Sequence, residues 1–397
     1  MSKYPLGMKK KIVLYPHTFI WREGCTGLLF NIDTNAYIFT NLNDPTIASA
    51  FNQWEKVDSL YSAIVDTSFL NSFWVDLQKK ELGVILDEIE PFFSYPPSLR
   101  IKNDIDRLLQ NHDSLDDISV LQYVLRIIVA IGGRCNNLPY WKQGVYPIDS
   151  QEPLKVERLV GFLNQCDMRE LSNIDLVISE WDPTLIYSFS TKLENHKDLV
   201  RFFFVNEDVG YKNSILSSLV NDGFPVVQIC IPDRTITKAN WIEGREYELL
   251  VRSEDELSYW ETLIGNNTSI KYAIKPIADN NLDFFFKNVF LSEEEILSQK
   301  LTKKDIFRHQ ALNVNQFGSL YIYPDGTIHP AADAPAIGTL EDSVHQTIIR
   351  ELEENHAWRQ TRRLMEPCNN CIFHDLCPSP SVYERIFGVP GCTYWKE

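Results

Sequence analysis

The chain has 397 residues, of which 44% are hydrophobic and 23% are charged, a composition typical of a globular protein. Disordered chains, collagens and coiled-coil rods are excluded. Its 38 lysine and arginine residues stand against 54 aspartate and glutamate residues, and a formal net charge of −16 argues against a protein that tracks nucleic-acid phosphates. No stretch reaches the roughly 18–20 apolar residues of a membrane span. No signal peptide is evident, so we expect a cytoplasmic protein with no membrane or nucleic-acid partner.

The N-terminal part, residues 1–110, is expected to form one domain. Three short β-rich segments, Thr18–Glu23, Leu28–Ile32 and Ala36–Thr40, are separated by turn-forming residues. Apolar residues then recur at helical spacing. A β-meander followed by helices is typical of a small winged-helix domain. The residues that indicate the helices are Ile47, Phe51 and Trp54, and then Phe69, Phe73, Val75 and Leu77.

The pattern changes from about residue 120, where short apolar runs alternate with polar helical stretches. Strands buried on both faces have this appearance, and helices between them imply parallel βαβ units. Six runs predict an α/β fold with a partial (β/α)6 barrel over residues 120–310. In such barrels the chemistry lies at the carboxyl ends of the strands. The runs are Leu125–Ile131, Ile174–Ile178, Arg201–Val205, Val226–Ile231, Tyr247–Val251 and Tyr272–Ile277.

A third part, residues 311–397, begins with a predicted hairpin. Leu320–Tyr323 and Thr327–His329 flank the turn Pro324-Asp325-Gly326. A charged, helical stretch is expected from about Ser343 to Arg363. The cysteine-rich tail follows this stretch.

Four of the eight cysteines fall in the last thirty residues, with two, five and fourteen residues between successive members. A Cys-x2-Cys pair brings two thiolates to one metal, and two further thiolates complete a tetrahedral shell. Such a set suits structural zinc or an iron–sulfur cluster. Without an export signal, clustered thiols indicate metal ligands rather than disulfides. The predicted ligands are Cys368, Cys371, Cys377 and Cys392.

The tail also resembles a known module. Residues 323–330, the segment Ile337–Leu340 and the cysteine spacing are similar to a SPASM domain, which carries auxiliary clusters in many radical SAM peptide-modifying enzymes. Pro330, Ala331 and Ser381 stand at cysteine positions of the full pattern. The resemblance implies that one auxiliary cluster is lost and that the four remaining cysteines hold a single auxiliary [4Fe–4S] cluster. Zinc is the alternative.

The first two barrel strands resemble those of radical SAM enzymes in degenerate form. The cluster motif Cys-x3-Cys-x-aromatic-Cys matches at Cys135 and Trp141, but Pro139 and Lys142 occupy the other two cysteine positions. One thiolate cannot hold the catalytic cluster. The Gly-Gly-Glu-Pro motif after the second strand is replaced by Glu180, Trp181 and Asp182 before proline, which denies close backbone approach to a ligand. We therefore expect no binding of S-adenosylmethionine and no catalytic residues.

These features together resemble the pseudo-radical-SAM family of GG-Bacteroidales peptide-maturation systems. The segment from Cys377 to Glu384 and the pair Trp358-Arg359 carry the resemblance. It implies a pseudo-enzyme that accompanies an active radical SAM maturase of a small ribosomal peptide. Two alternatives stay open: a diverged radical SAM peptide-modifying enzyme, and a zinc-stabilised peptide-binding scaffold.

The N-terminal part resembles the leader-peptide recognition element of such pathways. In that module a leader peptide adds a strand to the free edge of a three-stranded meander by main-chain hydrogen bonding. The alternative is an ordinary winged-helix-like domain whose aromatic residues serve only packing. We expect the N–H of Ile38 to face outward from this edge. The matching residues are Ala36, Tyr37, Ile38, Phe39 and Thr40.

Overall fold

The structure is a computed structural model, and the chain divides into two compact, discontinuous units. The first comprises residues 1–103, 292–312 and 361–379, and the second comprises residues 104–291, 313–360 and 380–397. The three predicted domains stay a prediction. The structure describes residues 9–66, 71–92, 94, 105, 120–132, 143, 152–178, 182–205, 212–230, 244–265 and 270–394.

The first unit contains two three-stranded antiparallel sheets. The predicted meander is confirmed, with the order β2–β3–β4. The second sheet, β5–β1–β6, is not predicted, and its central strand β1 begins with three lysines, which obscure the apolar pattern of a strand. The strands are β1 Lys9–Leu14, β2 Thr18–Glu23, β3 Thr26–Asn31, β4 Tyr37–Asn41, β5 Ser62–Asp66 and β6 Gly83–Asp87.

Helices α1 and α2 form the hydrophobic core of the first unit together with the sheets. The side chain of Asp44 caps α1 and that of Asn71 caps α2, each by accepting a backbone N–H of the first turn. Val75 lies on the solvent face of α2 and is 50% exposed, so it is not one of the packing residues of this helix. The helices of this unit are α1 Pro45–Trp54, α2 Ser72–Lys79, α9 Glu293–Ser298 and α10 Lys303–Ala311, with 3-10 turns at Val57–Ser59, Arg362–Leu364 and Cys368–Asn370.

The second unit is built on a nine-stranded sheet with the order β12-β11-β10-β9-β8-β7-β13-β14-β15. The six predicted strands, β7 to β12, are confirmed and run parallel. The predicted hairpin is also confirmed, and β13 joins the parallel sheet beside β7. The strands are β7 Arg126–Gly132, β8 Asn173–Ile178, β9 Val200–Val205, β10 Val226–Cys230, β11 Arg245–Val251, β12 Lys271–Pro276, β13 Ser319–Ile322, β14 Thr327–His329 and β15 Gly338–Thr339.

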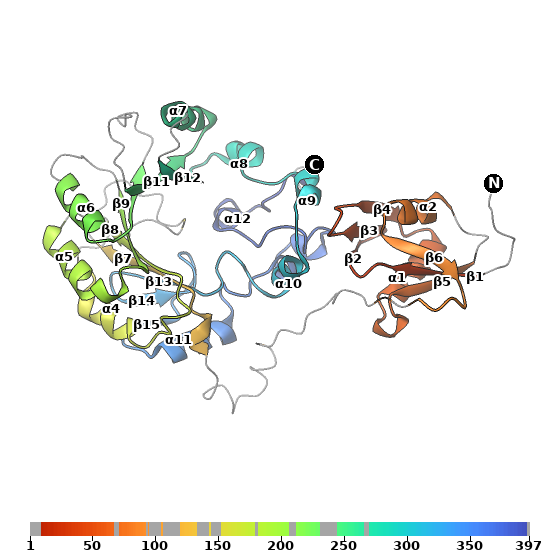
Figure 1. The fold of residues 1–397 in the computed structure, drawn as a ribbon, viewed down its shortest axis with the longest axis horizontal. Helices are drawn as coiled ribbons and strands as arrows, with labels where there is room; N and C mark the ends of the chain where they lie inside the picture. Colours follow the sequence, from red (N-terminus) through yellow and green to blue (C-terminus); the bar gives the residue numbers. More distant parts are fainter. Residues whose placement is uncertain are drawn as a thin grey trace. The chain divides into compact units, whose positions relative to one another are not determined.

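Helices connect the parallel strands and cover one face of the sheet, as Figure 1 shows for α4, α5 and α6. The chain is therefore a mixed α/β protein with a parallel sheet. The predicted helix from Ser343 to Arg363 is shorter than expected, because Asn355 adopts a left-handed conformation with φ of 54° and ends α11. The helices are α4 Val156–Leu163, α5 Pro183–Lys192, α6 Lys212–Asn221, α7 Glu254–Ile264, α8 Leu282–Asn288, α11 Val344–Glu354 and α12 Val382–Phe387, with 3-10 turns at Val120–Tyr123 and Glu194–His196.

Among the described residues, no helix is both long and apolar enough to cross a membrane.

Candidate functional site

The residues that resemble degenerate radical SAM motifs follow β7 and β8 along the chain. Asp182 is described and caps α5: its Oδ1 accepts the N–H of Thr184 at 2.8 Å and that of Leu185 at 3.3 Å. An acidic residue at this position therefore has a structural task at the start of a helix. The other positions, Cys135, Pro139, Lys142, Glu180 and Trp181, lie outside the described residues.

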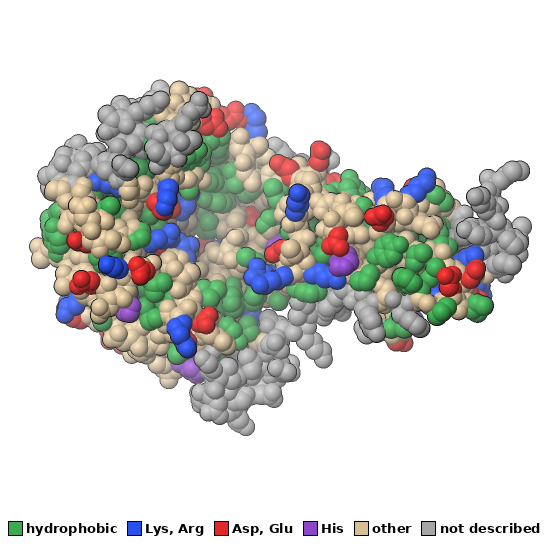
Figure 2. Space-filling model, in the orientation of Figure 1, with side chains coloured by type: hydrophobic (Ala, Val, Ile, Leu, Met, Phe, Trp, Pro, Cys, Tyr) green, Lys and Arg blue, Asp and Glu red, His purple; other side chains and the backbone are tan. Residues whose placement is uncertain are grey.

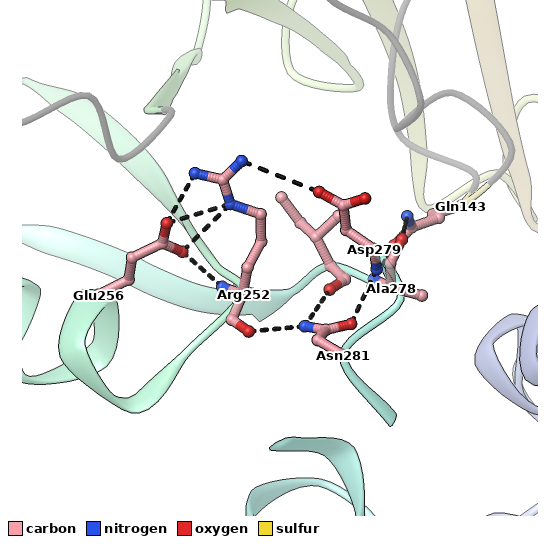
Figure 3. A network of polar contacts seen from close by, with 7 residues as sticks. Gln143, Arg252, Glu256, Ala278, Asp279 and Asn281 are labelled. Carbon is pink, nitrogen blue, oxygen red and sulfur yellow. Dashed lines mark hydrogen bonds and ion pairs between the residues drawn. The ribbon is translucent and has the colours of Figure 1, made fainter. Parts of the chain in front are cut away.

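A polar network lies at the carboxyl ends of β11 and β12 (Figure 3). The buried side chain of Gln143 donates from Nε2 to Ala278 O at 2.8 Å and accepts the N–H of Ala278 at 2.9 Å. Gln143 comes after β7 in the chain and Ala278 comes after β12, so this pair of hydrogen bonds joins the segments that follow the first and the last of the six predicted strands. Nothing in the sequence indicates this pairing, because the two residues are far apart along the chain.

The same network engages Arg252, the residue directly after β11 (Figure 3). Its guanidinium donates to Glu256 Oε1 from Nε at 3.0 Å and from Nη2 at 2.7 Å, and its Nη1 lies 3.9 Å from Asp279 Oδ2. Asn281 Nδ2 donates to Arg252 O at 2.6 Å and to Ile277 O at 3.0 Å. These polar groups hold one another in place. Their arrangement contains no nucleophile paired with a base.

A charge cluster around a buried carboxylate lies on the face of the parallel sheet opposite α4 to α6 (Figure 1). Asp175 on β8 is 1% exposed and accepts hydrogen bonds from Arg126 and Arg201, each at a shortest distance of 2.7 Å. Apolar residues of this face pack beside it, among them Val177 and Phe203. Figure 2 shows hydrophobic side chains at the bottom of a hollow next to these strands. In the sequence, this cluster is indicated only by three charged residues, Arg126, Asp175 and Arg201, that lie within runs predicted to form buried strands.

The four predicted metal ligands are all buried, at 4–6% exposure. Cys368, Cys371 and Cys377 belong to the first unit, whereas Cys392 belongs to the second. Over the described residues, no group of three or more His, Cys, Asp or Glu side chains is arranged to hold a metal ion. The metal site stays a prediction.

The surroundings of two of these sulfurs suit metal-bound thiolates. The buried guanidinium of Arg362 places Nη1 3.5 Å from Cys368 Sγ. The N–H of Phe373 donates to Cys371 Sγ, also at 3.5 Å. Donors aimed at sulfur stabilise the negative charge of a ligand thiolate and tune a cluster or zinc site. Such donors fit a ligand role for Cys368 and Cys371.

Asp375 organises the loop between Cys371 and Cys377. This carboxylate is fully buried and receives two hydrogen bonds from Arg363, at 2.8 and 2.6 Å. Burial by itself would raise the pKa of Asp375, but hydrogen bonds from Arg363 and His374 and their positive charges hold the pKa well below its usual range. The loop is therefore built around a buried carboxylate that is paired with Arg363.

The loop that carries Cys392 is held by a different set of contacts, all within the second unit. Glu384 Oε1 accepts the N–H of Gly391 at 2.7 Å, and Thr393 N–H donates to Leu291 O at 3.0 Å. The hydroxyl of Tyr383 donates to Pro276 O, at the end of β12, at 2.8 Å. Tyr383 and Glu384, which carry part of the family resemblance, thus have identifiable structural tasks.

Successive residues of the edge strand β4 point their backbone N–H and C=O alternately towards β3 and away from it. The N–H of Asn31 donates to Ala36 O at 2.8 Å, and the N–H of Leu42 donates to Cys25 O at 2.6 Å. Hydrogen-bonded and non-hydrogen-bonded pairs alternate in an antiparallel ladder, so the even-numbered residues direct their backbone to β3. The odd-numbered residues, Tyr37, Phe39 and Asn41, direct theirs outward.

This alternation of backbone direction shows that the N–H of Ile38 does not face outward, so the prediction for this residue is wrong. Ile38 is paired with Leu29 and its N–H faces β3, as do the backbone groups of Ala36 and Thr40. Its side chain is 9% exposed and packs in the core of the unit. The side-chain alternation in the sequence does not reveal hydrogen-bond phase, which depends on the register with β3.

The outward edge is partly occupied at both ends. Tyr37 O accepts a hydrogen bond from Lys80 Nζ at 2.9 Å, and Asn41 O accepts the N–H of Asp44 at 3.3 Å. Phe39 lies between these two ends. Within the described part of the chain, neither its backbone N–H nor its backbone C=O has a hydrogen-bond partner. Tyr37 and Phe39 are 37% and 38% exposed and their rings contact each other at 5.7 Å. The free stretch of the edge is therefore centred on Phe39.

No family model and no curated protein matches this chain. Among solved structures it is similar to SuiB of Streptococcus suis bound to the precursor peptide SuiA, with a TM-score of 0.44 and 10% identity over 96% of this chain and 98% of that chain. SuiB bound to S-adenosylmethionine gives a TM-score of 0.42 and 11% identity over the same shares of 96% and 98%. The structure of anSMEcpe with AdoMet and the Cp18Cys peptide gives 0.40 and 12% over 66% of this chain and 94% of that chain. Similarity at these values carries no conclusion about activity, and the absence of S-adenosylmethionine binding stays a prediction.

Proposed function

We propose that this protein is a non-catalytic, radical SAM-like partner that binds the leader of a ribosomal precursor peptide and assists an active radical SAM maturase. The observation that carries the proposal is the outer strand β4, whose Phe39 offers its backbone N–H and C=O to an added strand. Main-chain hydrogen bonds supply affinity in this mode of recognition, and side chains of alternate residues supply specificity.

The non-catalytic part of the proposal rests on residue chemistry. Pro139 and Lys142 replace two of the three thiolates that the catalytic cluster of a radical SAM enzyme needs. Asp182 is engaged as the cap of α5 rather than left open to a ligand. The polar groups after β11 and β12 are engaged with one another.

We further propose that Cys368, Cys371, Cys377 and Cys392 hold one metal centre, a [4Fe–4S] cluster with zinc as the alternative. When bound, a centre with four thiolates supplies a cross-link for a loop-rich segment and, in the case of iron, a site for electron transfer. Arg362 and the N–H of Phe373 would stabilise two of the ligand sulfurs.

The peptide proposal is tested by titrating the full-length protein with synthetic leader segments of the short open reading frames adjacent to its gene. The full chain is required because β2 to β4 belong to a unit that includes residues 292–312 and 361–379. We expect saturable binding to one leader. Phe39→Pro removes an outward N–H and should abolish it, while the matched control Phe39→Ala keeps the N–H and should weaken it only modestly.

Two results would contradict the proposal: no leader binds, or binding is equally strong in Phe39→Pro.

Iron analysis after anaerobic reconstitution separates the alternatives. About four iron atoms per chain fit a single [4Fe–4S] cluster, and about eight would favour the diverged enzyme. Zinc without iron would favour the scaffold.

A further inference from the structure

Lys80 lies at one end of the free edge of β4. It follows α2 directly, its side chain is exposed, and its ammonium donates to Tyr37 O at 2.9 Å. The same Nζ lies 5.6 Å from the centre of the Tyr37 ring, within the range of a cation–π contact. A positive charge is thereby fixed beside the outward-facing backbone of the edge strand.

This charge is not neutralised by the part of the chain that the structure describes. No carboxylate there lies within ion-pair distance of Lys80. Two other cations of the same unit differ: Lys10 pairs with Asp87 at 2.5 Å, and Arg22 pairs with Glu55 at 2.8 Å. Lys80 instead uses a neutral carbonyl as its acceptor.

Strand addition at β4 changes the environment of this ammonium. Tyr37 O faces outward, so a strand that extends along the edge from Phe39 brings its own N–H to that carbonyl. The incoming N–H displaces Lys80 from Tyr37 O. The displaced ammonium stays next to the added strand, because the Tyr37 ring and the end of α2 hold it there. A carboxylate on that strand is the group that would restore its lost hydrogen bond.

We propose that the peptide recognised at β4 is an extended segment with an aspartate or glutamate beside the residue that pairs with Tyr37, and that Lys80 selects for this acidic side chain. The inference rests on the proposed function and defines its ligand more narrowly.

The competing role for Lys80 is to guard the edge. Lysines on edge strands discourage unwanted strand pairing, and a cation at a helix C-terminus is favourable in its own right. The two roles predict opposite results. If Lys80 only guards, its removal strengthens the binding of every peptide alike. If Lys80 selects, its removal weakens the binding of acidic peptides but not that of neutral ones, which no longer have to displace the ammonium from Tyr37 O.

The test uses a displayed library of random dodecapeptides, selected on the full-length protein and counter-selected on Phe39→Pro. We expect edge-dependent peptides enriched in Asp or Glu at one fixed position, and we expect Lys80→Glu to select Lys or Arg at that position. Lys79→Gln is the matched control, since Lys79 is the adjacent exposed lysine at the end of α2. It should leave the selected sequences unchanged.

Synthetic peptides from the selection give the quantitative result. Lys80→Gln should weaken an acidic peptide about two- to fivefold, as expected for an exposed ion pair, and should not weaken its Gln-substituted counterpart. Added salt should reduce the preference for the acidic peptide in the wild type but not in Lys80→Gln.

Two outcomes would overturn the inference: edge-dependent peptides without an acidic preference, or Lys80→Gln strengthening all of them. A selection that yields no peptide sensitive to Phe39→Pro would instead contradict the proposed function itself.

Discussion

The indole Nε1 of Trp21 donates a hydrogen bond of 2.9 Å to Asp375 Oδ2. Trp21 lies on β2, whereas Asp375 lies between Cys371 and Cys377, so this bond ties the meander to the cysteine loop. The ring of Phe39, on β4, also meets the ring of Phe373 at 6.0 Å in an edge-to-face contact. One face of the meander therefore packs on the loop that we assign to the metal.

Trp21→Phe should destabilise the protein by about 1.5–3 kcal/mol, because it removes a donor from a buried carboxylate. The matched control is Trp54→Phe in the same unit, where the indole donates to Ile12 O, a neutral carbonyl, at 3.2 Å. This control should cost only about 0.5–1.5 kcal/mol. Urea unfolding followed by circular dichroism measures both. Equal effects would show that Asp375 does not depend on Trp21.

Cys371→Ser should lose the metal and should loosen β2 to β4 as well as the cysteine loop. Both effects follow if the metal holds the loop on which Trp21 and Phe39 pack. Metal analysis and hydrogen exchange of the full chain measure them. Cys25→Ser, at an exposed cysteine outside the set, is the control and should change neither. Full metal content in Cys371→Ser would contradict the ligand assignment. Unchanged exchange in β2 to β4 after metal loss would contradict the coupling.

The alternating apolar and polar segments predicted much of the fold. The six runs from Leu125 onward became β7 to β12. Strands covered on both faces need continuous apolar residues, and this holds for β7 to β11, whereas the edge strand β12 has no buried residue. Turn residues around Gly24 and Asn35 delimited the meander in the same way, and both adopt positive φ of 54° and 55°.

The contacts that build the candidate site could not be predicted in this way. Trp21 and Asp375 are separated by 354 positions, and the Gln143–Ala278 pair by 135. Neither pair lies in a local motif. The spacing of the four cysteines also does not indicate that Cys392 belongs to a different unit from Cys368.

Acidification should destabilise the first unit through His309. Burial lowers the pKa of this imidazole, although Asp305 and Asp375 oppose the shift. Its Nδ1 lies 2.9 Å from Asp375 O, to which the neutral ring donates. The unfolded chain takes up a proton near pH about 6.5, where the folded chain does not. The stability that neutral His309 supplies is therefore present above that pH. It is lost as the pH falls from the pKa of His309 in the unfolded chain towards its lower pKa in the folded chain.

His309→Gln keeps a donor and cannot titrate, so it should flatten this part of the pH dependence. Urea midpoints measured between neutral and mildly acidic pH provide the comparison. His356→Gln, at a residue of the second unit that pairs with Glu354 near the surface, is the control and should leave the profile unchanged. A wild-type profile that does not fall below neutral pH would refute the role of His309.

The central claim, that this chain is a peptide-binding partner and not a radical SAM enzyme, is tested most directly by assaying S-adenosylmethionine cleavage. The measurement is the yield of 5′-deoxyadenosine from anaerobically reconstituted, chemically reduced protein, with and without its precursor peptide. Because Pro139 and Lys142 replace two cluster ligands and Trp181 replaces a glycine, we predict no product above the protein-free background. Turnover that Cys135→Ala abolishes would contradict the account and establish the chain as a diverged enzyme.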